Sequence, residues 1–254
     1  MKYYIVADIH GFYTEFIQAL TEKGFFEDKE PHKLIVCGDL YDRGSEAEAL
    51  QQFILDLLAK DEVILIRGNH EDLMLQLVNN WHMGSYFYPH FNSNGTIDTL
   101  CQLTKCKQND IFLQPDEVGR TALKNDFIQN IIPAMHDFYE TENHIFVHGW
   151  IPCIYDKETE SYSKIENWRD ASEKQWWEAR WINGIEAAFN GIVEMDKTIV
   201  CGHWHTSFGH SKYHNDGSEM DEDANFKPYY NNGIIALDSC CAKSRKINCI
   251  VIED

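Results

Sequence analysis

Five short segments of this chain place carboxylate, carboxamide and imidazole side chains among glycines. They are residues 8–11 (DIHG), 38–44 (GDLYDRG), 68–71 (GNHE), 148–149 (HG) and 202–205 (GHWH). Side chains of these types are the ligands that divalent first-row metals prefer. Two cations held in this way can acidify a water and neutralise phosphoryl charge without a nucleophilic serine or cysteine. The pattern therefore predicts metal-dependent phosphoester chemistry.

The metal-binding turn formed by segment 38–44 contains the carboxylate best suited to join two cations. Asp39 is flanked by a glycine in a tight turn, and a carboxylate that uses both oxygens can bridge cations about 3.5–4 Å apart. Asp8 and His10 lie two positions apart on an extended segment, so both can reach one of the cations. The other cation would take the neutral ligands Asn69, His148 and His203. Manganese, iron and zinc all suit this mixture of donors.

Three neighbouring residues predict how the reaction would be completed. A departing alkoxide needs a proton, and His70 is the expected donor because it adjoins a ligand without being required as one. Asp42 is placed to fix the tautomer of His70 and to raise its pKa. Arg43 offers a planar fork to phosphoryl oxygens and supplies positive charge that the chain as a whole lacks.

Apolar, largely β-branched runs directly precede nearly every ligand segment. These runs occupy residues 3–7, 33–37, 62–66, 143–147 and 198–201, and two further runs, at 234–237 and 248–252, are expected to close the sheet. Each is typical of a buried strand. Because side chains at the carboxyl ends of neighbouring parallel strands converge on one crevice, we expect the ligands to meet there.

Helical patterns alternate with these runs. Apolar residues recur at helical spacing over 12–23 and 71–79, and a capping-box pattern at 45–48 (SEAE) begins another helix. The Trp-rich stretch 172–190 is also expected to be helical. Alternation of strands and helices predicts an α/β fold with a mostly parallel sheet core.

Two stretches depart from this alternation. Residues 80–135 begin with a segment rich in aromatic residues, Gly, Asn and Ser and carry no ligand motif. We expect them to form an inserted, partly helical cap within a single domain spanning 1–254. Residues 209–229 are polar and acidic, which predicts a mobile surface loop.

The composition limits the possible partners. With 22 Lys and Arg against 41 Asp and Glu, the formal net charge is −19, which repels phosphate backbones and disfavours nucleic acid as a partner. No apolar stretch approaches the roughly 20 residues of a membrane span. The eight cysteines have no regular framework spacing and are expected to be reduced. We therefore expect a cytoplasmic protein that binds no membrane.

The motifs DxHG, GDxxDRG, GNHE and the later His-Gly resemble the phosphoprotein-phosphatase branch of the calcineurin-like metallophosphoesterases. Within this branch, the motifs are most similar to those of the bacterial and phage members, which include the symmetrical dinucleoside tetraphosphatases. The resemblance runs over most of the chain and includes residues 236–239 (ALDS) near its end. It implies a four-layer α/β/β/α sandwich with the site at the strand ends, and direct attack on phosphorus by a hydroxide that bridges two metal ions.

The resemblance also assigns roles to residues. The ligands of the first metal would be Asp8, His10 and Asp39, and those of the second Asp39, Asn69, His148 and His203. His70 with Asp42 would be the proton-donating pair, and Arg43 the phosphate clamp. We expect two divalent or trivalent metal ions, with manganese favoured over iron or zinc.

Two features depart from that branch. The Gly-His-x-His pattern at 202–205 is similar to the broader superfamily, where the second histidine joins the first metal, so His205 is expected as an additional ligand. The branch also carries a second phosphate-binding arginine near a tryptophan. Arg180 is the candidate here and Arg169 the alternative, because neither spacing matches cleanly.

These observations favour a protein serine/threonine phosphatase acting on phosphorylated proteins. The alternatives are a symmetrical dinucleoside tetraphosphate hydrolase or a broad phosphatase of small phosphoesters. A non-catalytic metal-binding scaffold is a further alternative, but a scaffold would not need His70, Asp42 and Arg43. A nuclease is disfavoured by the net charge of −19.

Overall fold

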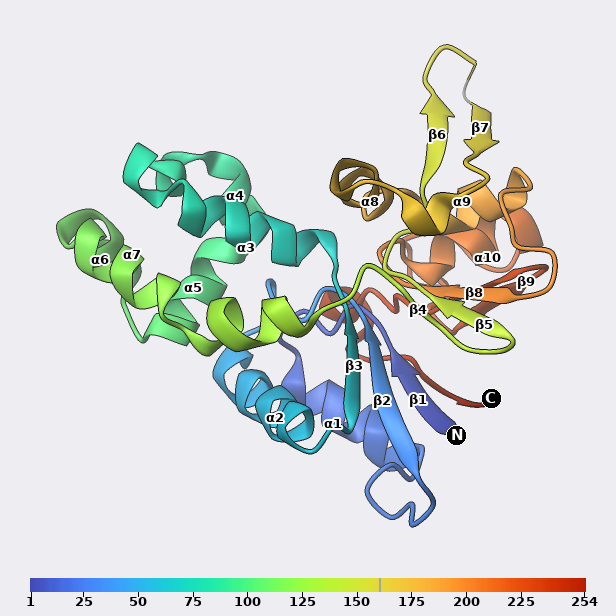
Figure 1. Cartoon of the computed structure of the whole chain (residues 1–254), viewed down its shortest axis with the longest axis horizontal. Helices are drawn as coiled ribbons and strands as arrows, with labels where there is room; N and C mark the ends of the chain where they lie inside the picture. The colour runs from blue at the N-terminus through green and yellow to red at the C-terminus, as the bar shows by residue number, and fades with distance from the viewer. Residues whose placement is uncertain (160) are drawn as a thin grey trace.

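Two β-sheets stacked face to face form the centre of the computed structural model, which describes residues 1–159 and 161–254 (Figure 1). The first sheet has the order β11-β1-β2-β3. Its strands are β1 (Lys2–Val6), β2 (His32–Cys37), β3 (Val63–Ile66) and β11 (Cys249–Glu253). Strands β1, β2 and β3 are parallel, and β11 pairs with β1 in the antiparallel direction. The ligand segments after β1, β2 and β3 therefore meet at one edge, as predicted.

The second sheet has the order β4-β5-β8-β10-β9. Its strands are β4 (Tyr139–Glu140), β5 (His144–Phe146), β8 (Thr198–Cys201), β9 (Tyr229–Asn231) and β10 (Ile234–Ala236). The three central strands β5, β8 and β10 are parallel, with antiparallel strands at both edges. A separate hairpin, β6 (Cys153–Asp156) with β7 (Ser161–Lys164), projects away from both sheets (Figure 1) and was not predicted.

The alternating direction of the side chains along β1 explains how the two sheets stack. Tyr3 and Ile5 point into a buried apolar layer shared with Phe146 and Val200 of the second sheet. The intervening Tyr4 and its neighbours on the opposite face pack under helices. Successive strand residues point to opposite faces, so a strand buried on both faces is apolar throughout. The apolar runs predicted as strands are of this kind.

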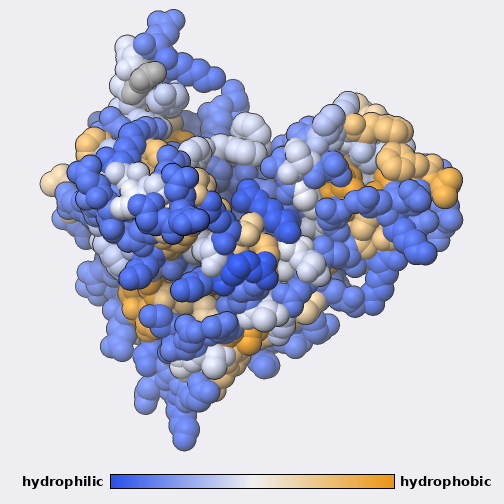
Figure 2. All heavy atoms as spheres, turned by 180° about the vertical axis from the view of Figure 1, so that it is seen from behind, coloured by the Kyte–Doolittle hydropathy of each residue, from blue (hydrophilic) through white to orange (hydrophobic). Residues whose placement is uncertain are grey.

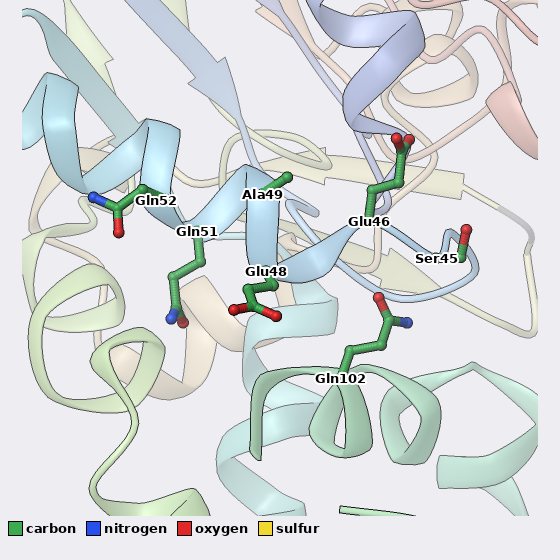
Figure 3. A pocket seen from close by; sticks show the side chains of 7 residues that line it. All are labelled: Ser45, Glu46, Glu48, Ala49, Gln51, Gln52 and Gln102. Atoms are coloured by element: carbon green, nitrogen blue, oxygen red, sulfur yellow. The ribbon is translucent and has the colours of Figure 1, made fainter. Parts of the chain in front are cut away.

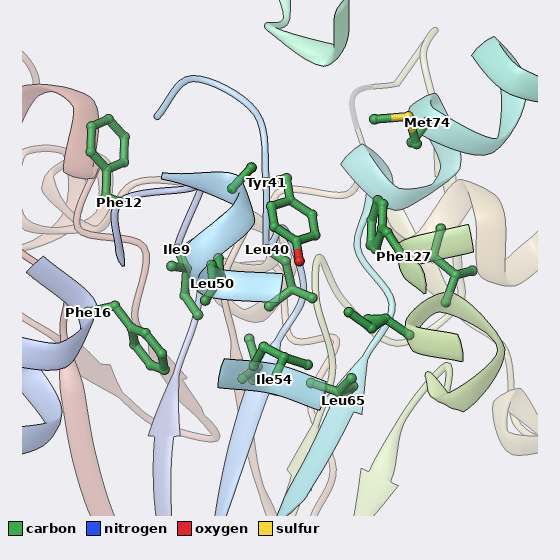
Figure 4. Close-up of a cluster of buried hydrophobic side chains, with 14 of the residues drawn as sticks. Ile9, Phe12, Phe16, Leu40, Tyr41, Leu50, Ile54, Leu65, Met74 and Phe127 are labelled. Atoms are coloured by element: carbon green, nitrogen blue, oxygen red, sulfur yellow. The ribbon is translucent and has the colours of Figure 1, made fainter. Parts of the chain in front are cut away.

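Helices cover the outer face of each sheet and complete the four layers. Helices α1 (Tyr13–Glu22) and α2 (Ala47–Ala59) pack on the first sheet through Phe16, Leu50 and Ile54 (Figure 4). Helices α9 (Gly184–Phe189) and α10 (Thr206–His214) contact strands β10 and β9 of the second sheet. The chain thus has the expected α/β sandwich architecture.

Residues 80–135 are helical over most of their length, more so than the sequence predicts. The elements are the short helices η1 (Trp81–Met83) and η2 (Ser85–Phe87), α4 (Pro89–Ser93), α5 (Thr96–Thr104), α6 (Gln108–Leu113), α7 (Pro115–Leu123), η3 (Phe127–Ile131) and η4 (Ile132–Ala134). They follow α3 (Asn69–Asn79) and form a lobe beside the sheets. Figure 2 shows, from behind, a notch between this lobe and the rest of the molecule.

The lobe shares its core with the sheets. Phe127 of the lobe packs edge-to-face on Tyr41, with ring centroids 4.5 Å apart (Figure 4). Ile97 and Leu100 of α5 belong to the same buried cluster as Leu50 of α2. Continuous apolar packing of this kind fixes the lobe relative to the sheets.

The second half carries three further helices. Helices η5 (Trp168–Asp170), α8 (Glu173–Ala179) and α11 (Cys241–Ser244) follow β7, η5 and β10 respectively. Stretch 172–190 is thus two short helices rather than one. None of the helices in the described part of the chain combines the length and apolar character that crossing a membrane requires.

Two local predictions are wrong. Ser45 does not cap α2, which begins at Ala47 without a side-chain cap; the Ala47 N–H instead donates to the Gln102 side chain of α5. Helix α10 extends to His214 into the stretch predicted as a loop. A Cβ on Gly209 would lie 2.8 Å from the Tyr229 ring, so close packing on the sheet outweighs the polar composition there.

Candidate metal centre

The backbone bends sharply in the segments that follow the strands, and the bends direct the side chains of these segments toward one another. Eleven non-glycine residues in the described part of the chain have positive φ. Six of them, with φ between 51° and 73°, are the predicted site residues Asp8, His10, Asp39, Asp42, Arg43 and His203. Such conformations cost about 1–3 kcal/mol each and concentrate at functional sites, where surrounding structure holds them.

The first group of candidate ligands consists of His10, Asp39 and His70, whose ligand atoms lie within 4.8 Å of one another. The His10 Nδ1–H donates to the Tyr41 carbonyl at 2.8 Å, so the lone pair of Nε2 faces Asp39 Oδ2 at 3.7 Å. Burial lowers the pKa of His10 well below its ordinary value, which keeps the ring neutral. A neutral imidazole and a carboxylate facing each other fit a cation between them.

The second group consists of Asp39, His148 and His203, again within 4.8 Å. His148 Nδ1–H donates to the Cys37 carbonyl at 2.8 Å. Its Nε2 lies 2.8 Å from Asn69 Oδ1 and 3.3 Å from Asp39 Oδ1. Burial lowers the pKa of His148, so Nε2 carries no proton. Three electron-pair donors therefore face one another at this point, an arrangement that a cation would satisfy.

Asp39 lies between the two groups and presents one oxygen to each. Its Oδ2 faces His10 and His70, and its Oδ1 faces His148. Although burial raises the pKa of Asp39, the surrounding imidazoles outweigh it and hold that pKa below its ordinary value. The carboxylate is ionised and shared, as a ligand between two cations must be.

Asp8 lies beside the first group. Its oxygens accept the His203 N–H at 3.1 and 2.9 Å, and Oδ1 lies 4.0 Å from His10 Nε2. Burial, with Asp238 and Asp39 nearby, raises the pKa of Asp8 well above its ordinary value. A Cβ on Gly202 would lie 2.1 Å from Asp8 Oδ2, so only glycine allows this approach. A bound cation would relieve the crowding of carboxylates around Asp8.

His70, Asp42 and Arg43 lie together at the edge of the first group. His70 Nδ1–H donates to Asp42 Oδ2 at 2.7 Å, and its Nε2 lies 3.5 Å from Arg43 Nη2. Burial lowers the pKa of His70, but Asp39 and Asp42 outweigh burial and raise it overall. Arg43 is exposed, and across residues 1–159 and 161–254 no carboxylate lies within 4.0 Å of its guanidinium. Its charge is free to meet an anion.

Two sequence-predicted site residues have other partners. Arg180, expected to bind substrate, is buried and its guanidinium donates to Asp72 at 2.7 Å and to Asp137 at 2.6 Å, which leaves it no free charge for phosphate. His205, expected as a metal ligand, contacts Ser207 Oγ at 2.9 Å and Glu219 Oε1 at 3.4 Å and joins neither ligand group of the described chain.

The alternative arginine also lies outside the site. Arg169 forms two hydrogen bonds with Glu140, at 2.7 and 2.6 Å, and stacks over the Trp168 ring at 4.2 Å. It is therefore a surface ion-pair partner, and among Arg43, Arg169 and Arg180 only Arg43 has no carboxylate partner in the described part of the chain.

Glu71 is a buried carboxylate whose role the sequence did not reveal. It accepts the backbone N–H groups of Asp39 at 3.1 Å, Leu40 at 3.0 Å and Gly68 at 2.7 Å. It thereby ties the turn after β2 to the turn after β3, and these turns carry Asp39 and Asn69. Burial and the nearby Asp39 raise the pKa of Glu71 to about 7. Glu71, the final residue of the GNHE motif, therefore holds together the two turns that carry Asp39 and Asn69.

Glu71→Gln should speed amide hydrogen exchange of the turns after β2 and β3 in the metal-free protein, because an amide NH₂ must face at least one of the three buried N–H donors of Asp39, Leu40 and Gly68. The measurement is amide exchange followed by mass spectrometry at pH 8. Glu178→Gln, which alters an exposed pair with Lys174, is the matched control and should leave exchange in both turns unchanged. Unchanged exchange of these turns in Glu71→Gln would contradict the structural role of Glu71.

Asp238 is a second buried carboxylate without an assigned role. It is 6% exposed, and its Oδ1 accepts the Cys240 N–H at 2.7 Å. Burial raises its pKa to about 6, and Asp39 acts in the same direction. Its charge contributes to the raised pKa of Asp8, so the two carboxylates are neighbours; the resemblance included residues 236–239 but gave Asp238 no role.

Comparison with known proteins agrees with this geometry. The calcineurin-like phosphoesterase family profile matches residues 1–235. The chain is 31% identical over 128 residues to a symmetrical bis(5'-nucleosyl)-tetraphosphatase of Buchnera aphidicola, covering 49% of this chain and 44% of that protein. It is 38% identical over 77 residues to an asymmetrical bis(5'-nucleosyl)-tetraphosphatase of Bacillus velezensis, covering 28% and 30%. The matches thus span less than half of these relatives.

Among solved structures, the chain is similar to a cold-active protein-tyrosine phosphatase of a psychrophilic Shewanella species. The TM-score is 0.51 at 19% identity, over 100% of this chain and 75% of that one. At this level of identity the likeness concerns the fold alone.

Proposed function

Because this chain belongs to the calcineurin-like phosphoesterase family, we propose that its substrates are dinucleoside tetraphosphates, each divided symmetrically into two nucleoside diphosphates. The chain is a metal-dependent phosphoester hydrolase. The sequence favoured phosphorylated proteins, but the curated relatives support the alternative, since several are named as symmetrical or asymmetrical tetraphosphatases. The substrate preference is accordingly assigned to the dinucleoside tetraphosphates.

The observation that carries the proposal is the sharing of Asp39 between two ligand groups beside a free guanidinium. Two cations would be held by the side chains of Asp8, His10, Asp39, Asn69, His148 and His203. When bound, they would lower the pKa of a nearby water and draw charge from phosphoryl oxygens. The remaining steps belong to residues of the chain itself.

Arg43 and His70 would act on the substrate. The planar fork of Arg43 pairs with phosphoryl oxygens of the substrate, because no carboxylate of the described residues lies within 4.0 Å of its guanidinium. His70 then donates the proton on Nε2 to the departing oxygen, while Asp42 holds Nδ1. In the balanced reaction, a water oxygen bonds to one central phosphorus, the bridging P–O bond breaks, and the proton goes to the leaving nucleoside diphosphate.

An uncharged stretch of chain adjoins this position. Residues 73–97 contain no Asp, Glu, Lys or Arg, although a quarter of the whole sequence is charged. Gly95, near the end of this stretch, lies so close to Arg43 that a Cβ there would be 2.6 Å from its backbone nitrogen. In a chain of net charge −19, a neutral approach weakens repulsion of a polyphosphate.

The test is a comparison of substrates with protein stripped of metal and reloaded with Mn²⁺, Fe²⁺ or Zn²⁺. We expect the highest kcat/KM for diadenosine tetraphosphate, with ADP as the single nucleotide product. Formation of ATP and AMP would show asymmetrical cleavage, and preference for a phosphoserine peptide would show a protein phosphatase. Either result would overturn the substrate proposal, and no turnover of any phosphoester would overturn the enzyme assignment.

A further inference from the structure

One face of α5 contacts the loop that carries the proton-donating pair. Thr96, Thr99 and Gln102 follow one another at intervals of three along this helix, so they lie on one side of it. All three side chains bond to the loop formed by residues 42–47. None of the three belongs to a ligand motif, and each of these bonds joins residues 54 to 58 positions apart.

Thr96 bonds the same carboxylate oxygen that orients His70. The Thr96 hydroxyl donates to Asp42 Oδ2 at 2.8 Å, and this oxygen also accepts His70 Nδ1–H at 2.7 Å. Thr99 acts from the next turn, where its hydroxyl oxygen accepts the Asp42 backbone N–H at 3.0 Å. Both threonines are buried. Asp42 is thus fixed at its side chain and at its backbone by one helix.

Gln102 holds the remainder of the loop. Its Nε2 donates to the Gly44 carbonyl at 3.0 Å, and its Oε1 accepts the Ala47 N–H at 2.9 Å. Figure 3 shows Gln102 rising from α5 toward Ser45 and the start of α2, across the polar pocket between the two helices. Ile97 and Leu100 of the same helix belong to the buried core and anchor α5 there.

The loop needs this external support because its backbone is strained. Asp42 and Arg43 both have φ of 73°, a conformation that costs each non-glycine residue about 1–3 kcal/mol. Such residues keep their geometry only where surrounding contacts over-determine it. A carboxylate on a strained turn without lateral bonds could rotate away from His70.

We propose that α5 is part of the hydrolytic site and that Thr96 is a positioning residue, which holds Asp42 in the orientation that His70 requires for proton donation. The proposal rests on the function proposed above, because it assigns Thr96 to the proton-donating step. It predicts an effect that depends on the leaving group, since only a poor leaving group needs the proton.

The test compares Thr96→Val with Thr96→Ser in the full-length, metal-loaded protein. Phenyl phosphate has a poor leaving group, with a pKa near that of tyrosine, about 10, and p-nitrophenyl phosphate has a better one. Thr96→Val should lower kcat for phenyl phosphate at least about tenfold more than for p-nitrophenyl phosphate, with KM and bound metal unchanged. Thr96→Ser, which keeps the hydroxyl, should restore the ratio.

Thr104→Val is the matched control, because the Thr104 hydroxyl donates within α5 to the Leu100 carbonyl at 2.7 Å and does not touch the loop. It should leave the ratio of the two substrates at the wild-type value. An equal loss on both substrates in Thr96→Val, or no loss, would overturn the positioning role.

A second measurement separates this inference from the proposed function. In metal-free protein, Thr96→Val should speed amide hydrogen exchange over residues 40–46, while Thr104→Val should not. If the wild type hydrolyses no phosphoester, the proposed function fails and exchange alone decides whether Thr96 holds the loop. Unchanged exchange in that case would overturn the inference as well.

Discussion

Asp39→Asn should remove hydrolysis almost completely, with kcat/KM at least about 10³-fold lower, a loss of about 4 kcal/mol in transition-state stabilisation. The carboxylate presents Oδ1 to one group of imidazoles and Oδ2 to the other, so it is the point on which both cation positions depend. A carboxamide has one weaker acceptor and no charge, and therefore cannot replace it. The measurement is kcat/KM on diadenosine tetraphosphate and p-nitrophenyl phosphate, with bound metal determined by mass spectrometry.

The control for Asp39→Asn is Asp28→Asn, the same chemical change at a carboxylate that pairs with Lys2 and Tyr4 away from the site. It should retain both metal ions and full activity. If Asp39→Asn kept two metal equivalents and wild-type turnover, the shared-ligand geometry would be wrong.

His70→Gln should give the second large effect, and it should do so without loss of metal. His70 donates through Nδ1 to Asp42 and directs Nε2 toward Arg43 and Asp39, so its loss removes the proton donor for the leaving oxygen. General acid catalysis typically contributes 10²–10⁴-fold, so we expect a fall of about that size for phenyl phosphate and a smaller one for p-nitrophenyl phosphate. Steady-state kinetics on both substrates, with metal analysis, provides the measurement.

His144→Gln is the control for His70→Gln, because it removes an imidazole that pairs with Asp254 far from the ligand groups. It should not change the ratio of the two substrates. If His70→Gln instead lost a metal ion, His70 would be a ligand rather than the acid, an outcome that its membership of the first ligand group makes measurable.

The sequence predicts the strands and the convergence of most candidate ligands, because both depend on local pattern. Each ligand segment follows an apolar run by one or two residues, and parallel pairing then brings the ends of β1, β2 and β3 together. Glycine spacing carries part of the same signal, since the residue before His203 must lack a Cβ to admit Asp8. Local pattern and topology were therefore sufficient to bring most of the predicted ligands into one site.

Partner choice among charged residues was not predictable in this way. Arg180 lies 108 positions from Asp72, and the pair joins the residue that ends α8 to the first turn of α3. His205 lies two residues after the candidate ligand His203, yet its ring contacts Ser207 and Glu219, which the sequence gives no reason to prefer. Such pairings depend on tertiary packing, which a motif does not contain.

The contribution of α5 was hidden for a related reason. Thr96 is 54 positions from Asp42 and lies in a stretch whose aromatic and polar composition suggested only a cap. The failed capping box at Ser45 has the same origin, since Gln102 from α5 satisfies the Ala47 N–H instead. At Asp42 and at the start of α2, the stabilising hydrogen bonds come from α5, and a local sequence motif does not contain them.

We propose that Asp39 joins two metal ions in one site. Anomalous diffraction at the manganese edge, from crystals of the Mn²⁺-loaded protein, tests it most directly. We expect two anomalous peaks about 3.5–4 Å apart on either side of the Asp39 carboxylate, one beside His10 and one beside His148. A single peak, or two peaks that Asp39 does not contact, would show that Asp39 does not join two metal ions.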